Sequence, residues 1–384
     1  MNRLLVLGLF LAVSIAALEA TAVITALPTI VDELDGRSLY GFTLAAYMLA
    51  TLLAIVSAGR AADRSGPARP FALSVLLFVI GLAVAGVAPS MPIVVLGRFL
   101  QGAGTGGFNA LAYVGVRLGF EEDRQPTVYA ILSAGWVLPS LVAPLISGSI
   151  VETVGWRWVF LGMLLPAVVV GLLTHRELRK LPTPPTPPPG HGSETSRLMR
   201  DALALVVGAG ALLGGLAALP RSALGFLLVV PGLALAAVGL RSLFPSGWLR
   251  ARTGVPATIS CRLLAAVAFM GVDSFVPLAA DRVHHVGAIA QGLVIIGAAL
   301  TWSVGQAAAA PAPRPGRGVH AGPDQVRPPR RRCAGSSAGP SPVDPALGDV
   351  PGVGARRARD GPVVQSDDGL RHVDGAGGRG RPGE

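Results

Sequence analysis

Long apolar segments without charged residues alternate with short polar segments along most of this chain. Seven runs lack Asp, Glu, Lys and Arg altogether. Each run reaches the roughly 18 residues that cross a hydrocarbon core about 30 Å thick, or falls one residue short. The runs are Tyr40–Ala58, Phe71–Ala88, Thr127–Val151, Trp158–Thr174, Ala202–Pro220, Ser222–Leu240 and Val283–Pro313.

Three further segments are equally apolar but hold one or two charged residues. They are Leu4–Pro28 with Glu19, Ile93–Val116 with Arg98, and Val255–Leu278 with Arg262 and Asp273. The segments are too long for membrane strands and do not alternate as strands do. The pattern therefore predicts an all-α integral membrane protein with about ten transmembrane helices.

The composition supports a membrane protein. Of the 384 residues 51% are hydrophobic and 14% are charged, with a mean hydropathy of +0.58. A soluble domain usually carries about 25% charged residues. The net charge of +10 is spread over loops between apolar runs, so it does not indicate nucleic-acid binding; the expected surroundings are the lipid bilayer. The two cysteines, Cys261 and Cys333, imply no disulfide framework.

The placement of basic residues predicts the orientation. With the N-terminus inside, the inner loops hold 14 Lys and Arg residues and the outer loops hold 4. The positive-inside rule then places the N-terminus in the cytoplasm of an inner or plasma membrane. A signal peptide over Leu4–Leu18, cleaved near Ala20–Ala22, is the alternative. The apolar stretch continues to Pro28 and favours a span.

The order of the segments predicts a two-bundle transporter. Residues 1–175 form an N-terminal bundle of six helices, and residues 176–200 form a cytoplasmic linker with a Pro-rich, extended core. Residues 201–241 form an extra transmembrane hairpin about Arg221, and residues 242–310 form a partial second bundle of two helices. Six spans, a linker and further spans are typical of such transporters.

The segment after the second span carries a turn motif. Residues 59–69 read GRAADRSGPAR, which resembles the loop signature GxxxDRxGRR of the major facilitator superfamily. The resemblance implies that Gly59, Asp63, Arg64 and Gly66 form a gating loop, although the usual basic pair is replaced by Pro and Ala. A turn on the positive side of the membrane without a gating role is the alternative.

The fourth span carries an intramembrane arginine. Residues 98–107 read RFLQGAGTGG and resemble the RxxQGxG motif of the same family. An ionised Arg98 is costly in the membrane unless it is paired or hydrated, and Gln101 lies one turn away. Gly102 and Gly104 allow neighbouring helices to approach closely. The alternative is that Arg98 only extends to the membrane surface.

The fifth span resembles the antiporter motif GxxxGPxxGG only in part. Residues 139–148 read PSLVAPLISG, in which Pro144 and Gly148 match and Pro139 replaces a glycine. A proline here bends the helix and frees a backbone carbonyl. Residues 156–160, WRWVF, also resemble the multidrug branch of the family.

The first span holds the candidate proton carrier. Residues 18–28 read LEATAVITALP and resemble the LDxTIVNVALP signature of the 14-span drug:proton antiporters, with Glu19 in place of the aspartate. A carboxylic acid among apolar helices can exchange protons near neutral pH, because desolvation disfavours its ionised form. Glu19 can equally be a structural partner of Arg98. Arg262 and Asp273 in the ninth span are 11 residues apart, so they share a helix face but cannot pair with each other. Asp273 belongs either to the transport path or to the membrane interface.

These resemblances imply a major facilitator fold with a complete first bundle. They imply proton-coupled efflux, by antiport, of a small amphipathic or cationic compound of the multidrug type. The implied partners are protons and a small-molecule substrate, with no nucleic acid, no cofactor and no metal. The protein is expected not to be an enzyme. It is also expected to be a monomer. A metabolite uptake facilitator of the same fold and a non-transporting truncated relic remain alternatives.

Residues 311–384 differ from the rest of the chain. They contain no apolar run long enough to span a membrane and are rich in Gly, Pro and Arg. Since 31 of the 32 basic residues of the chain are Arg, the gene is expected to be GC-rich. We expect an out-of-frame, disordered tail after about Gln306, which reading the gene in the other two frames would test. A genuine disordered tail is the alternative.

Overall fold

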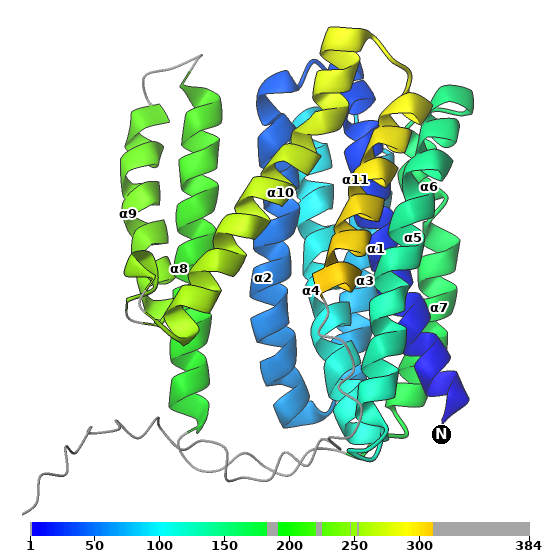
Figure 1. Ribbon diagram of the computed structural model, residues 1–384, viewed down its shortest axis with the longest axis vertical. Coiled ribbons are helices and arrows are strands. Elements are labelled where there is room, and N and C mark those ends of the chain that lie inside the picture. The colour runs from blue at the N-terminus through cyan, green and yellow to red at the C-terminus, as the bar shows by residue number, and fades with distance from the viewer. Residues whose placement is uncertain (1, 183–190, 220–224, 246, 252, 310–384) are drawn as a thin grey trace, which may run out of the picture. The chain divides into compact units, whose positions relative to one another are not determined.

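The computed structural model describes residues 2–182, 191–219, 225–245, 247–251 and 253–309, and these form helices joined by turns, with no strand among them (Figure 1). The helices are α1 Arg3–Glu33, η1 Arg37–Leu39, α2 Tyr40–Ser65, α3 Ala68–Gly86, α4 Met91–Gly119, α5 Gln125–Thr153, α6 Arg157–Leu161, α7 Leu164–Leu178, α8 His191–Ala218, α9 Phe226–Leu243, η3 Trp248–Arg250, α10 Val255–His284 and α11 Ala288–Ala309.

Local sequence signals set several of the helix ends. Asn2 caps α1, since its Oδ1 accepts a hydrogen bond from the backbone N–H of Leu5 at 3.3 Å. A proline occupies the first turn of α4, α5 and α10, where its missing N–H has no intrahelical partner to lose. Gly66 ends α2 with a φ of 73°, a conformation that favours glycine.

Eight described helical segments are long and apolar enough to cross a membrane. They are Arg3–Glu33, Arg37–Ser65, Ala68–Gly86, Gln125–Thr153, Arg157–Leu178, Ser196–Ala218, Phe226–Leu243 and Val255–His284. The other two predicted spans correspond to α4, which holds Arg98, Gln101 and many glycines, and to α11, whose described apolar stretch is Ala288–Gly297. An all-helical, multi-pass membrane protein is therefore confirmed.

The helices pack in a pattern that brings α4 against two neighbours. α4 packs against both α2 and α3, and α1 packs against α5 and α7. The hairpin of α8 and α9 contacts α2 through α8, whereas α11 contacts α5 and α10. The largest shares of the buried apolar core lie on α1 and α4, so these two helices form its centre.

Glycines on α4 form two close contacts with the neighbouring helices. A Cβ added at Gly102 or Gly106 would meet the backbone of α2, at Tyr47 and Thr51 respectively. A Cβ at Gly104 would meet Ser74 and Phe78 of α3. Membrane helices that lack side chains at a contact can bring their backbones close and gain packing energy. We call these two contacts the glycine seams of α4.

Some predictions concern residues outside the described part of the chain. They include the Pro-rich core of the linker, Arg221 of the predicted hairpin, and the out-of-frame tail. All described helices belong to one unit, Met1–Ala312. The predicted boundaries at residues 175, 200 and 241 therefore stay predictions.

Candidate functional site

A buried ion pair joins α1 to α4. Glu19 lies in the middle part of α1 and Arg98 lies in the first half of α4. Nη1 of Arg98 donates a hydrogen bond to Oε1 of Glu19, and the two side chains are 2% and 1% exposed, respectively. Removing two charges from water is costly unless they are paired. Each side chain therefore accounts for the burial of the other.

Two further side chains contact Arg98, and a third holds one of them. Its Nη1 also donates to Oε1 of Gln101 at 2.8 Å, three residues along the same face of α4. The guanidinium carbon lies 4.1 Å from the centroid of the Tyr47 ring, a cation–π contact from α2. Tyr47 in turn donates to Oγ1 of Thr105 at 3.1 Å. Arg98 is thus held inside the bundle, and the alternative that it extends to the membrane surface is wrong.

The same cluster contains polar atoms with unused hydrogen-bonding capacity. Oε2 of Glu19, Nε of Arg98 and Nε2 of Gln101 are buried and have no hydrogen-bond partner among the described residues. Buried polar groups are nearly always hydrogen-bonded, so such atoms require an explanation. The cluster therefore offers one free acceptor and two free donors at the centre of the bundle.

The matched residues of α5 lie against α11. Pro144 and Gly148 are buried, and a Cβ at Gly148 would meet the backbone of Ala288 and Ile289. Pro139 is half-buried, one turn before Pro144 on the same helix. The small residues of this motif thus permit a close contact between α5 and α11, as glycines do elsewhere in membrane helices.

The motif at the end of α2 is mostly helical. α2 continues to Ser65, so Gly59, Asp63 and Arg64 lie on its last turns and only Gly66 lies in the turn itself. The expectation that all four form a loop is corrected, because a helix can continue past the last apolar residue where water surrounds its polar side chains. Asp63 and Arg64 are exposed and form no ion pair with another described residue.

The two charged residues of α10 lie in different surroundings. Arg262 is exposed, whereas Asp273 is half-buried. Asp273 lines a cavity of about 450 Å³ between α10 and α11. The other lining residues are apolar: Ala265, Ala268, Phe269, Val272, Val276 and Val294. Apart from the carboxylate of Asp273, the wall of this cavity is therefore apolar.

Ionic contacts connect the last turn of α1 to other helices. Asp32 accepts hydrogen bonds from Arg282, at the end of α10, and from Arg37. Glu33 accepts from Nε1 of Trp156 at 2.8 Å and from Nη1 of Arg157 at 2.6 Å, next to the start of α6. These contacts hold four segments together at one end of the bundle.

Two polar contacts of α5 complete this arrangement. Oε1 of Glu152 accepts a hydrogen bond from the backbone N–H of Ile289 at 3.0 Å, which caps the start of α11. The buried hydroxyl of Ser147 donates to the carbonyl oxygen of Ala22 on α1 at 2.7 Å. α5 therefore has side-chain hydrogen bonds to both α1 and α11.

Sequence reasoning missed several of these residues. Thr105 lies one turn after Gln101 inside the matched motif. The four-residue spacing therefore predicts that both lie on the same face of α4. Tyr47, Asp32 and Glu152 gave no comparable signal, because their roles depend on which helices are neighbours.

Long apolar helices that surround a buried ion pair define a multi-pass helical membrane protein. Residues 9–319 match the model of the Major Facilitator Superfamily. This match covers more than half of the chain, so the chain belongs to the Major Facilitator Superfamily. The family predicted from the motifs is confirmed.

Relatives with assigned names include efflux proteins. A "Probable multidrug-efflux transporter" of Mycobacterium tuberculosis is 28% identical over 315 residues, which is 78% of this chain and 64% of that protein. An "MFS-type efflux pump" of Fusarium sp is 32% identical over 184 residues, 48% of this chain and 32% of that protein. The chain thus spans between about a third and two thirds of these relatives.

Solved structures give a more distant likeness. A D-xylose-proton symporter aligns with a TM-score of 0.44 and 15% identity, over 78% of this chain and 80% of that one.

Proposed function

We propose that this protein exports a small amphipathic or cationic compound in exchange for protons. The observation that carries the proposal is the buried pair of Glu19 and Arg98, with a free carboxylate oxygen on Glu19. An ionisable residue inside a membrane helix bundle is expensive and marks a functional site by default. The efflux names of the mycobacterial and Fusarium relatives support the direction of transport.

Glu19 is the proposed proton carrier. When its free Oε2 takes up a proton, the carboxylate loses its charge and the attraction to Arg98 falls. Arg98 then keeps its contacts with Gln101 and Tyr47. The positive charge left on Arg98 in turn favours release of the proton. One proton could thus be bound and released in each transport cycle without any cofactor.

The substrate is proposed to contact the cavity between α10 and α11. Asp273 supplies one negative charge among apolar side chains, as a lipophilic cation requires. The matched residues of α5 and the last turns of α2 are proposed to take part in the conformational change. We further propose that the protein is a monomer of the inner or plasma membrane with its N-terminus in the cytoplasm.

Proton-driven efflux from vesicles that contain the purified protein tests the proposal. We expect the Glu19→Gln variant to lose efflux driven by a pH gradient while it still binds a cationic dye. The amide has nearly the same shape as the carboxylic acid but cannot carry a proton. The control is Glu122→Gln, which removes an exposed carboxylate between α4 and α5 and should leave efflux unchanged.

The same vesicles separate the alternatives. Undiminished gradient-driven efflux by Glu19→Gln would remove this residue from the coupling mechanism. Accumulation rather than export of a metabolite would support an uptake facilitator of the same fold. In the Asp273→Asn variant, we expect weaker transport of cationic dyes than of neutral ones; equal transport would place the substrate charge elsewhere.

A further inference from the structure

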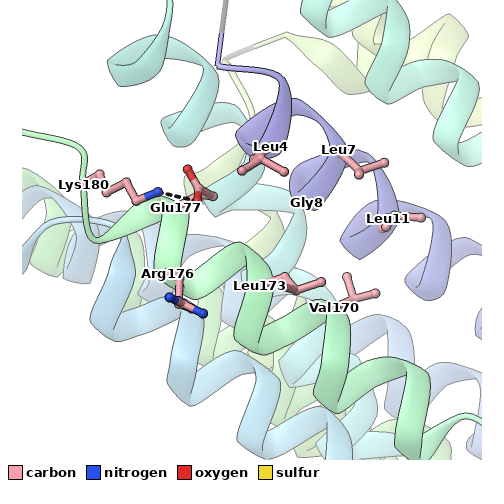
Figure 2. Close-up of a pocket in the computed structure, with 9 residues that line it drawn as sticks. All are labelled: Leu4, Leu7, Gly8, Leu11, Val170, Leu173, Arg176, Glu177 and Lys180. Carbon is pink, nitrogen blue, oxygen red and sulfur yellow. Dashed lines mark hydrogen bonds and ion pairs between the residues drawn. The ribbon is translucent and has the colours of Figure 1, made fainter.

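A groove lies between α1 and α7, at the end of the bundle where α1 begins and α7 ends. Its volume is about 290 Å³, and Figure 2 shows the side chains that line it from both helices. The residues from α1 are Leu4, Leu7, Gly8 and Leu11, and those from α7 and the residues just after it are Val170, Leu173, Arg176, Glu177 and Lys180. Neither Glu19 nor Asp273 lines this groove.

The chemistry of the groove changes along its length. The two helices run in opposite directions, so Leu11 and Val170 lie toward one end and Leu4 and Arg176 toward the other. The lining is apolar at the first end and charged at the second. On α7 the change occurs between Val170 and Arg176, or over about 9 Å of helix. A phospholipid has the same order of chemistry along its length, from acyl chain to phosphate.

A tight contact forms the floor of the groove. Gly8 faces Thr174, and a Cβ at Gly8 would meet the backbone and side chain of that residue. The leucines on either side remain open to the outside of the bundle: Leu4, Leu7 and Leu173 are 63%, 52% and 52% exposed. An acyl chain can therefore reach them from the bilayer.

The charges at the polar end leave a net positive charge. Glu177 accepts hydrogen bonds from Nζ of Lys180 at 2.5 Å and from Nδ2 of Asn2 at 3.1 Å. One carboxylate therefore faces two cations, Lys180 and the exposed Arg176. Basic residues next to the apolar region of a membrane protein attract anionic lipid headgroups.

We propose that this groove binds one anionic phospholipid. An acyl chain lies along the leucines of α1 and α7, and the phosphate lies against Arg176 and Lys180. Charge complementarity distinguishes this groove from an ordinary lipid-facing surface, because a zwitterionic headgroup gains less from two cations. The proposal does not depend on the direction of transport or on protons.

Native mass spectrometry of the full chain in detergent tests the proposal. The protein is incubated with equal amounts of phosphatidylglycerol and phosphatidylcholine of the same chain length. We expect phosphatidylglycerol to be retained preferentially, and Arg176→Gln to lower that preference about fivefold, as expected for one lost cation near a headgroup. The matched control is Arg179→Gln, an exposed cation of the same helix end that does not line the groove.

A second pair of variants tests the apolar part. Leu173→Trp fills the groove and should lower retention of both lipids, whereas Leu172→Trp, on the same exposed helix but outside the groove, should not. Equal retention of the two lipids by the unaltered protein would overturn the proposal. So would an equal response to Arg176→Gln and Arg179→Gln. If glycerol phosphate alone displaced the bound phosphatidylglycerol and Leu173→Trp had no effect, the groove would be an anion site only. That result would also overturn the proposal that it binds a lipid.

Discussion

Arg98 contacts three side chains, although one ion pair would be enough to balance its charge. One guanidinium is paired with Glu19, donates to Gln101 and lies over the ring of Tyr47. The flat, forked guanidinium can do this from one position, whereas the ammonium group of a lysine is a point charge on a flexible chain. The cluster therefore depends on the shape of Arg98 as well as on its charge.

We expect Arg98→Ala to lower the stability of the protein by about 3–5 kcal/mol, because Glu19 is left as an unpaired buried charge. Arg98→Lys should also lose transport, since it cannot keep all three contacts. Thermal unfolding in detergent and vesicle efflux measure the two effects. The double variant Glu19→Gln with Arg98→Gln is the control, and it should be more stable than Arg98→Ala. Full activity of Arg98→Lys would show that charge alone is sufficient.

The site could be predicted at the level of single residues but not of contacts. Glu19 and Arg98 were identifiable because charged residues are rare in apolar spans. Their pairing was only one of two compatible interpretations. The contact with Tyr47 depends on α2 and α4 approaching each other, which no residue in the sequence of α2 reveals.

At the scale of the helices, the packing of α4 depends on glycines, which have no side chain at the contacts with α2 and α3. Gly102 and Gly104 present no side chains to α2 and α3, and the backbones are therefore close enough that added atoms would overlap. Such contacts place Arg98 and Gln101, which lie on the same helix, at a fixed distance from Tyr47.

We expect Gly102→Ala to destabilise the protein by about 1–3 kcal/mol, the usual cost of overpacking, because its Cβ would meet the backbone of Tyr47. Gly59→Ala, within α2, is the matched control, since no atom lies within 4 Å of the Cβ it adds. Alanine also favours a helix more than glycine does. Comparison of the two melting temperatures in detergent measures the difference, and equal values would show that the seam relaxes freely.

The helices themselves were the most predictable part of the fold. Apolar runs of sufficient length can satisfy their backbone only as helices in a membrane, so their positions follow from the sequence. Details within a run do not: the predicted span Trp158–Thr174 is two helices, α6 and α7, separated at Gly162 and Met163. The extension of α2 through Asp63 was also missed, because the motif suggested a loop.

At the scale of the molecule, α2 fixes two positions on opposite sides of the membrane. Asp35 precedes this span and Arg64 lies at its end. From the excess of basic residues in alternate loops we expect Asp35 to face outward and Arg64 to face the cytoplasm.

Cysteine labelling measures this orientation. In a background with Cys261→Ser and Cys333→Ser, a membrane-impermeant maleimide added to intact cells should modify Asp35→Cys and not Arg64→Cys. Permeabilised cells, in which both should react, provide the control. Labelling of Arg64→Cys alone in intact cells would reverse the orientation, and the groove between α1 and α7 would then face the other leaflet.

The glycine seams of α4 also restrict how this protein can evolve. At positions 102, 104 and 106 an added Cβ would overlap a neighbouring helix, so each substitution there carries a cost in stability. In contrast, only 6% of the most apolar stretch of α10 is buried, and substitutions around Asp273 disturb few neighbours. Adaptation to a new compound is therefore expected to proceed through α10, while α4 remains unchanged across variants that survive selection.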